Sequence, residues 1–413
     1  MAGFGRWFQG LFGSNAESVT SLMRDALYEP VASPAFADDS TNFAFRMYEH
    51  LRQQSGNLFF SPLSIRTALA MAEAGARGEA ASQMRETLCI SSSEEAAHGA
   101  FARTLARLNA TGGANCEVAV ANSLWTQKGA PLQSEYIDLI AGDYAGSVNV
   151  VNFCAAVEAA REAINRWVEE KTRQRIQELI PEGALSPASR LVLVNAVYLK
   201  AKWELPFRRA ATREETFYLE DRRTLETPLM HQQKDIRYVQ GRSYQAVELD
   251  YRGGDLSMLV LLPDRKDGLR DLETTLSVQM LNDCVKQMDY REVMLALPRF
   301  KMTWGTDVSD LLKKLGMLLA FSEQADFSGI NGRRPPDYEA LFISAVLHKA
   351  FVEVDEEGTE AAAATGVVLK MGRLLTEPPT NFRADHPFLF AIRDKASGVI
   401  LFLGRVADPT LRG

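Results

Sequence analysis

Hydrophobic and polar residues follow one another in blocks that predict alternating helices and strands. A helical pattern begins at Thr41. Residues 58–60 form a short apolar strand that Pro62 stops, and an Ala-rich helix follows from Ser61 to Ala74. Further helical patterns cover residues 80–88, 94–108, 156–178 and 307–315.

Runs rich in β-branched and aromatic residues predict the strands. Residues 190–199 are almost continuously apolar, which is typical of a central strand covered on both faces. Residues 388–392 and 399–405 flank a turn and predict a closing hairpin. The other predicted strands cover residues 118–125, 246–251, 256–262, 293–300 and 342–355.

One α+β domain explains this order of elements better than several domains do, because residues 40–408 contain no repeat and no low-complexity linker. The domain is expected to span residues 39–409, and residues 1–38 are expected to form a flexible N-terminal tail. A chain of 413 residues with 46% hydrophobic residues builds a core without disulfides.

Charge and composition limit the classes of partner and cofactor. The net charge of −7 argues against a nucleic acid as the main partner, and residues 94–108 are not basic enough to suggest a glycosaminoglycan site. No cofactor or metal motif is present, so we expect neither. Four widely spaced cysteines without a CxxC motif are expected to be free, namely Cys89, Cys116, Cys154 and Cys284.

The N-terminal residues do not resemble a targeting signal. They lack the continuous apolar core and the cleavage site of a signal peptide. No run of residues is apolar for long enough to predict a membrane span. The sequence leaves the cellular compartment open.

The segment from Val354 to Leu375 is the most informative part of the chain. Its Ala-rich run favours a helix, but the following Gly-Val-Val-Leu favours extended chain. From Thr359 onward, one set of alternate residues is uncharged and the other carries a charge at each end, as in a strand with one buried face. A segment that is a loop in one state and a strand in another is a conformational switch. The alternative is a flexible surface loop.

Motifs of the common enzyme classes are missing from the sequence. Ser61, Ser64 and His348 are candidates for a hydrolase site, but no oxyanion motif accompanies them. A buried hydrogen-bond cluster explains these three residues better, because buried polar groups need partners.

Five segments, in this order, resemble the serpin family of serine protease inhibitors over about residues 40–408. They are NLFFSPLSI at 57–65, LVNAVYLKAKW at 193–203, ISAVLHKA at 343–350, VDEEGTEAA at 354–362 and FRADHPF at 382–388. The resemblance implies a single serpin-like domain in which three β-sheets are surrounded by about nine helices. It also implies an exposed reactive loop at about residues 356–381.

The resemblance implies a mechanism of inhibition. In this family a protease attacks the reactive loop, and the cut loop inserts into the central sheet while the protease stays attached as an acyl ester. Insertion drags the protease across the domain and distorts its active site, so deacylation becomes very slow. The distance from Thr359 to Arg373 in extended chain is roughly 46 Å, at about 3.3 Å per residue.

The resemblance also assigns roles by position. The hinge of the loop comprises Glu356, Glu357, Gly358, Thr359, Glu360, Ala361, Ala362, Ala363 and Ala364. The shutter, which lies beneath the strands that part, comprises Ser61, Ser64, Asn195 and His348. Trp203 marks the breach, where insertion begins. Non-inhibitory members tend to carry a charged or bulky residue at the hinge, so the resemblance favours an active inhibitor.

Two counts place the bond that the protease cuts. Counting forward from Gly358 gives Gly372–Arg373, whereas counting back from Phe382 is compatible with Arg373–Leu374. A trypsin-like specificity pocket holds a buried carboxylate and needs a cation, which favours Arg373–Leu374. The remaining alternatives are Lys370–Met371, Met371–Gly372 and a merely solubilising role for Arg373.

We expect a monomeric inhibitor of trypsin-like serine proteases with Arg specificity, and not an enzyme. The first alternative is a non-inhibitory chaperone or carrier with the same fold. The second is a serine hydrolase that uses Ser61 or Ser64. Many members of the family are secreted, although this chain has no convincing leader.

Overall fold

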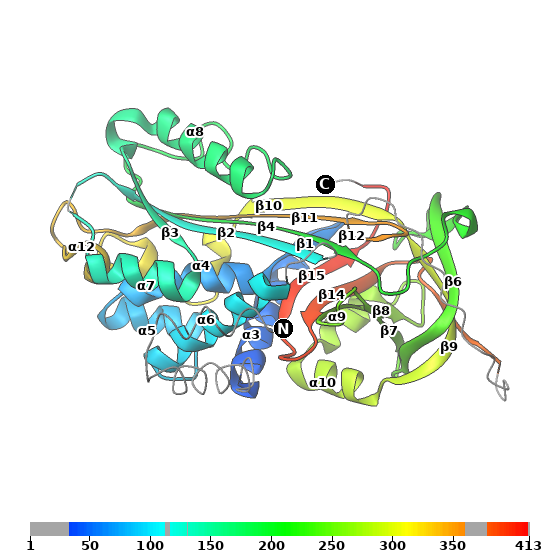
Figure 1. The fold of residues 1–413 in the computed structure, drawn as a ribbon. Coiled ribbons are helices and arrows are strands. Elements are labelled where there is room, and N and C mark those ends of the chain that lie inside the picture. Colours follow the sequence, from blue (N-terminus) through cyan, green and yellow to red (C-terminus); the bar gives the residue numbers. More distant parts are fainter. Residues whose placement is uncertain (1–32, 112–115, 130, 360–377, 412–413) are drawn as a thin grey trace, which may run out of the picture.

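The described residues form two β-sheets, and helices cover their faces (Figure 1). The computed structural model describes residues 33–111, 116–129, 131–359 and 378–411. The α+β class expected from the sequence is confirmed.

Most of the described α-helices lie in the first half of the chain. Within the described residues, the α-helices are α3 (Pro34–Leu51), α4 (Pro62–Gly75), α5 (Gly78–Thr87), α6 (Glu94–Thr111), α7 (Ser134–Tyr144), α8 (Phe153–Lys171), α9 (Leu269–Thr275), α10 (Val278–Gln287), α11 (Ser309–Lys314) and α12 (Ser328–Asn331), and the short 3-10 turns are η2 (Arg209–Ala211) and η3 (Leu319–Phe321). None of the helices in these ranges combines the length and the apolar character needed to cross a membrane.

One sheet, called the central sheet here, contains six strands within the described ranges, in the order β10-β11-β12-β4-β2-β3. Their bounds are β10 (Phe300–Asp307), β11 (Ile343–Val354), β12 (Gly358–Thr359), β4 (Leu191–Lys202), β2 (Cys116–Gln127) and β3 (Ser147–Val151). β4 runs parallel to β11 and antiparallel to β2.

In the described part of the chain the second sheet has nine strands, eight of them in the order β1-β15-β14-β8-β7-β6-β9-β13, and β5 pairs with β6. Their bounds are β1 (Leu58–Phe60), β5 (Arg213–Tyr218), β6 (Thr224–Gln240), β7 (Tyr244–Asp250), β8 (Leu256–Pro263), β9 (Asp289–Pro298), β13 (Thr380–Arg383), β14 (Phe388–Asp394) and β15 (Ile400–Val406). Three sheets were expected. The described residues form two because the long β6 pairs with β5 and β9 and then, at its end, with β7.

β4 is buried on both faces, as its continuous apolar sequence predicts. Leu193, Val197 and Leu199 belong to the large inner core, whereas Val194 and Tyr198 pack with the residues of α8 on the outer face. Figure 1 shows α8 on one side of the central sheet and α4, α6 and α7 on the other. Burial of each such side chain stabilises the fold by about 1.5–3 kcal/mol.

The start of the first helix differs from the expectation. α3 begins at Pro34 rather than Thr41, because Ser33 caps it by accepting from the Phe36 N–H at 3.2 Å and proline suits the first helical position. Phe36 is buried and packs edge-on against Phe101 at 5.0 Å. The expected tail at residues 1–38 is therefore wrong from Pro34 onward, and residues 1–32 lie outside the described residues.

The end of α8 also differs. The helix stops at Lys171 and does not continue to residue 178, because Arg173 and Gln174 adopt positive φ angles of 49° and 62°. Ile176 is nevertheless buried, as the helical pattern predicted, because the segment folds back against the outer face of the sheet. The closing hairpin of β14 and β15 is confirmed, and the four cysteines are free as expected.

Candidate functional site

The chain folds back after β11 and re-enters the central sheet as β12. Thr359 pairs with Val354 on one side and with Ala201 on the other, and Gly358 pairs with Lys202. β12 therefore lies between β11 and β4 at one end of these strands. Below β12, β11 and β4 pair directly, in parallel, over residues 343–351 of β11.

The turn between β11 and β12 is held by Asp355. Its Oδ1 accepts the N–H groups of Glu357 at 2.9 Å and Gly358 at 3.1 Å, and its own N–H donates to the Gly358 carbonyl at 2.9 Å. Burial raises the pKa of Asp355, although the two backbone N–H groups oppose that rise. Such an aspartate turn specifies a tight reversal of the chain.

Glu356 anchors the turn to the rest of the site. Burial opposes ionisation of this carboxyl, but hydrogen bonds from Arg299 and Thr212 outweigh burial, so its pKa is lowered. The Arg299 Nε lies 2.9 Å from Glu356 Oε1, and Thr212 Oγ1 donates to the same oxygen. Glu356 is only 2% exposed, so loss of Arg299 would leave a buried charge without its partner.

Gly358 sits where the backbones of β12 and β4 approach most closely. A Cβ atom at this position would lie 2.0 Å from the Ala201 carbonyl oxygen and 2.6 Å from the Lys202 Cα. Both obstacles are backbone atoms, which cannot move aside without breaking the strand. Only glycine fits here while β12 is in the sheet.

Trp203 follows β4 and holds β12 in place. Its Nε1–H donates to the Asp355 carbonyl at 2.9 Å, and its backbone N–H donates to the Glu357 carbonyl at 2.9 Å. Its ring stacks on Tyr251 with centroids 4.6 Å apart. The Tyr251 hydroxyl is 2.8 Å from Thr359 Oγ1, and burial raises the pKa of Tyr251 far above its usual value. Thr359 is fully buried.

A polar cluster crosses the middle of the central sheet. His348 on β11 faces Asn195 on β4, which faces Asn122 on β2. His348 Nε2 accepts the backbone N–H of Ser61 at 3.2 Å, so the ring proton sits on Nδ1 and is donated to the Asn195 carbonyl oxygen. Burial lowers the pKa of His348 to about 3, so the ring is neutral.

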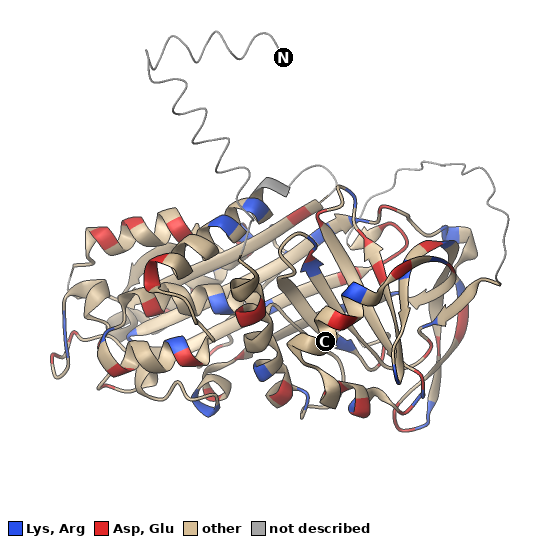
Figure 2. Cartoon of the chain, turned by 90° about the horizontal axis from the view of Figure 1, so that it is seen from below, with Lys and Arg blue, Asp and Glu red and all other residues tan. Residues whose placement is uncertain are grey.

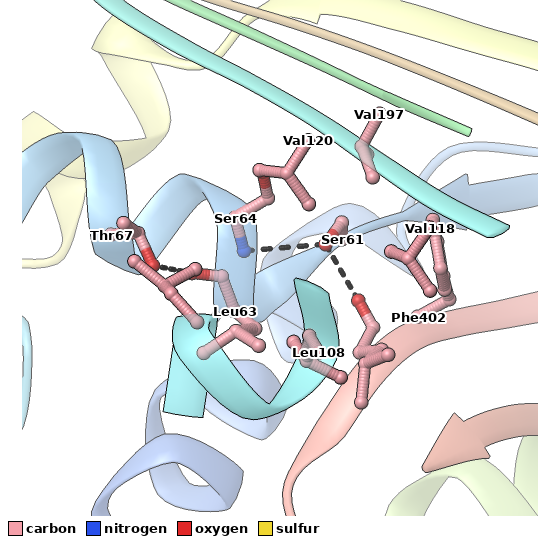
Figure 3. Close-up of a pocket in the computed structure, with 11 residues that line it drawn as sticks. Ser61, Leu63, Ser64, Thr67, Leu108, Val118, Val120, Val197 and Phe402 are labelled. Carbon is pink, nitrogen blue, oxygen red and sulfur yellow. Dashed lines mark hydrogen bonds between the residues drawn. The ribbon is translucent and has the colours of Figure 1, made fainter. Parts of the chain in front are cut away.

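The two serines complete this cluster from below the sheet (Figure 3). Ser61 Oγ donates to the Leu401 carbonyl at 2.6 Å and accepts from the Ser64 N–H at 3.2 Å. Ser64 Oγ accepts from the Asn195 amide and donates to Asn122 Oδ1 at 3.3 Å. His348 bonds to the backbone of Ser61 and to neither serine hydroxyl in the described contacts, so the hydrolase hypothesis is wrong about how these residues are arranged.

A small cavity lies beside the serines, beneath β2 and β4 (Figure 3). Its volume is about 10 Å³, which is room for about one water molecule. Apolar side chains form most of its wall, including Leu105, Leu108 and Val197. The cavity is a packing defect next to the polar cluster and is too small for a ligand.

The sequence analysis missed three residues of the site. Asn122 interrupts the apolar inward face of β2 between Val120 and Leu124, and that interruption was a detectable signal. Tyr251 and Arg299 carried no local signal, because their importance comes from contacts with Thr359 and Glu356 respectively. The structure brings Ser61, Ser64, Asn195 and His348 together, and it places Glu356, Glu357, Gly358 and Thr359 beside Trp203. The remaining hinge and reactive-bond residues lie outside the described residues, namely Glu360, Ala361, Ala362, Ala363, Ala364, Gly372, Arg373 and Leu374.

Comparison with known proteins gives one consistent result. The family profile described as Serpin (serine protease inhibitor) matches residues 38–409. An uncharacterized serpin-like protein of Thermococcus kodakarensis is 41% identical over 371 residues, which cover 89% of this chain and 84% of the relative. The leukocyte elastase inhibitor of Bos taurus is 39% identical over 380 residues, which cover 90% of this chain and 98% of the relative.

Solved structures agree with the sequence relatives. Serpin48 of the insect Tenebrio molitor matches with a TM-score of 0.81 and 31% identity, over 91% of this chain and 98% of that one. Human thyroxine-binding globulin matches with a TM-score of 0.82 and 28% identity, over 91% of this chain and 99% of that one.

Acidification is expected to weaken the polar cluster through His348. The unfolded chain takes up a proton below about pH 6.5, whereas folded His348 stays neutral down to a pKa of about 3. The free energy of unfolding therefore falls by about 1.4 kcal/mol per pH unit within that window. The urea midpoint of the native protein should fall more between pH 7.5 and pH 5 than that of His348→Gln.

The control for this experiment is His50→Gln, because His50 is exposed on α3. Gln at position 348 can accept from Ser61 and donate to Asn195 without titrating. Equal pH dependence of the native protein and His348→Gln would show that the ring does not control this stability.

Gly358→Ala is expected to expel β12 from the sheet, because the added Cβ collides with the backbone of Ala201. The backbone N–H groups of Trp203 and Phe207 then lose their acceptors in the turn. Hydrogen exchange of the peptide that contains both residues should accelerate by at least about tenfold, which corresponds to about 1.4 kcal/mol. Gly142→Ala in α7 is the matched control, because nothing lies within 4 Å of its added Cβ. Unchanged exchange in Gly358→Ala would contradict the close packing described here.

Proposed function

The chain belongs to the serpin family, and from that premise we propose that it inhibits serine endopeptidases of trypsin-like specificity by covalent trapping. Members of this family are in general protease inhibitors rather than enzymes, and relatives of this chain are named as protease inhibitors. The trypsin-like specificity and the trapping mechanism are our inference for this protein.

The position of β12 carries the proposal. Gly358 and Thr359 already pair with β4 and β11, so the first residues of the hinge lie between the strands that would receive the rest of the loop. Further insertion exchanges one β4–β11 ladder for two new ladders, one on each edge of the incoming strand. The sheet therefore gains hydrogen bonds when it opens.

The proposed reaction begins as ordinary proteolysis. The serine hydroxyl of the protease attacks the carbonyl carbon of Arg373, an ester forms, and the Arg373–Leu374 peptide bond breaks with Leu374 leaving as a new amino terminus. The freed loop then inserts between β4 and β11 and carries the esterified protease with it. Hydrolysis of the ester becomes very slow because the catalytic site of the protease is distorted.

The choice of Arg373 rests on charge. The buried carboxylate of a trypsin-like pocket binds a cation, and glycine at position 372 offers none. Gly372–Arg373 remains the alternative bond. We propose that the inhibitor acts as a monomer with one protease molecule and needs neither a nucleic acid nor a cofactor.

The alternative function is that of a non-inhibitory carrier or chaperone. Thyroxine-binding globulin, a structural neighbour, has a name that describes a binding protein. The hinge argues for inhibition instead, because buried Thr359 is small and uncharged and fits the sheet without strain.

Mixing the protein with trypsin should give an adduct that survives SDS and heat on a denaturing gel. Mass spectrometry should find a released C-terminal peptide that begins at Leu374. Cleavage in the loop without an adduct would contradict trapping, and a peptide beginning at Arg373 would move the reactive bond to Gly372–Arg373.

Thr359→Arg should convert the inhibitor into a substrate. Thr359 is fully buried between β4 and β11, and burial of an unpaired charge there costs several kcal/mol. Loop cleavage by trypsin should continue while the yield of adduct falls at least about tenfold. Thr359→Ser keeps the hydroxyl that meets Tyr251 and should trap normally. Normal trapping by Thr359→Arg would refute the insertion argument.

A further inference from the structure

A polar cavity lies on the outer face of the central sheet, beside the chain that leaves α8. Its volume is about 350 Å³, within the range of small-molecule sites. β2 and β4 form its floor, and the segment after α8 forms its wall. The lining residues are Glu117, Tyr198, Lys200, Arg173, Gln174, Arg175 and Gln177.

The lining of this cavity is cationic. Arg173, Arg175 and Lys200 contribute three positive charges, and Glu117 contributes one negative charge, so the formal excess is two positive charges. The whole chain has a net charge of −7. Figure 2, which views the molecule from below, shows Lys and Arg interspersed with Asp and Glu along the chain.

One wall of the cavity is held in a defined conformation, and we call residues 172–178 the wall segment. The Gln174 N–H donates to the Glu169 carbonyl at 2.7 Å, and the Arg175 N–H donates to the Thr172 carbonyl at 2.9 Å. Thr172 Oγ1 accepts the Ile176 N–H at 3.2 Å, and both of these residues are fully buried. The cations of the wall therefore project from an ordered backbone.

Glu117 is the acidic residue of the cavity lining. Its carboxylate accepts from the Tyr198 hydroxyl at 3.0 Å and pairs with Arg173 at 2.7 Å. Lys200 lies directly opposite Glu117 on the neighbouring strand. An anion that enters the cavity meets Lys200 on the floor and Arg173 and Arg175 on the wall, and it competes with Glu117 for Arg173.

We propose that this cavity binds a small polyanion with at least two negative charges, of the phosphorylated or polycarboxylate class. Arginine forks match the oxygen geometry of phosphate and carboxylate groups, and charge-assisted hydrogen bonds of this kind are among the strongest in proteins. The volume excludes a polymer as the buried part of the ligand and suits a small metabolite.

Occupancy of the cavity has a consequence that rests on the proposed function. The Lys349 ammonium on β11 donates to the Gln177 carbonyl at 2.7 Å, and Arg173 pairs with Glu117 on β2. The wall segment thus spans from β2 to β11, across the line along which β4 and β11 pair. An anion held between Lys200 and this segment adds a contact that opposes separation of the strands and slows loop insertion.

Titration calorimetry of the intact protein with inorganic pyrophosphate, and separately with citrate, tests the site. The expected result with one or both anions is a single site with a Kd of about 1 mM or tighter. Lys200→Ala should weaken binding about tenfold, because it removes a charge-assisted contact. Glu117→Gln should tighten binding, because it removes the competing charge while keeping an acceptor for Tyr198.

The matched control is Lys286→Ala, an exposed lysine on α10 that lies outside the cavity lining. It should bind like the native protein. Absence of binding by both anions, or equal weakening by Lys200→Ala and Lys286→Ala, would overturn the proposal. The anion that binds more tightly shows whether the site prefers the phosphate class or the carboxylate class.

A kinetic measurement separates this proposal from the proposed function. If trypsin is trapped, the bound anion should increase the number of inhibitor molecules cleaved per protease trapped, and Lys200→Ala should remove the increase. If trypsin is not trapped at all, the calorimetric result still decides whether the anion site exists. An increase that persists in Lys200→Ala would contradict an effect through this cavity.

Discussion

Below β12, backbone hydrogen bonds between β4 and β11 close the central sheet. The residues of the candidate site lie along this row of hydrogen bonds, called the β4–β11 line here. The two strands are parallel and far apart in the sequence, so no tight turn ties them together. In the proposed insertion, an incoming strand would replace the lost ladder on both of its edges. In the proposed mechanism the sheet exchanges this ladder for two ladders, and the contacts at one end and in the middle of the β4–β11 line oppose the exchange.

Side-chain contacts stabilise the pairing of β4 with β11 at two places. At one end, Glu356, Gly358 and Trp203 fix β12, a two-residue strand that leaves no room for a Cβ atom at position 358. In the middle, neutral His348 joins β11 to Asn195 on β4. Because that pair is buried, breaking it exposes polar groups to an apolar core unless new partners are supplied. If the loop inserts as proposed, the cluster favours the closed and the fully inserted states over intermediates.

The sequence predicted what depends on local pattern. The strand at 190–199 and the closing hairpin both carry periodicity or composition that can be read directly. The end of α8 could not be predicted, because the apolar pattern continued through Ile176 while the backbone had already left the helix at Arg173. The extra turns of α3 depended on the packing of Phe36 against Phe101, a contact between separate helices. Asn122 was within reach of pattern analysis, whereas Arg299 and Tyr251 gain their roles only in three dimensions.

The hydrogen bond from Ser61 to the Leu401 carbonyl has a consequence for the order in which the protein folds. Ser61 caps α4, but its acceptor belongs to β15, 340 residues later in the chain. Within the part of the chain that the structure describes, β1 likewise pairs with β15 alone. Contacts between such distant segments form late, because loop closure must precede them. The cluster beneath the central sheet is therefore incomplete until β15 has been synthesised and has joined the second sheet, because only then does the Ser61 hydroxyl find its acceptor.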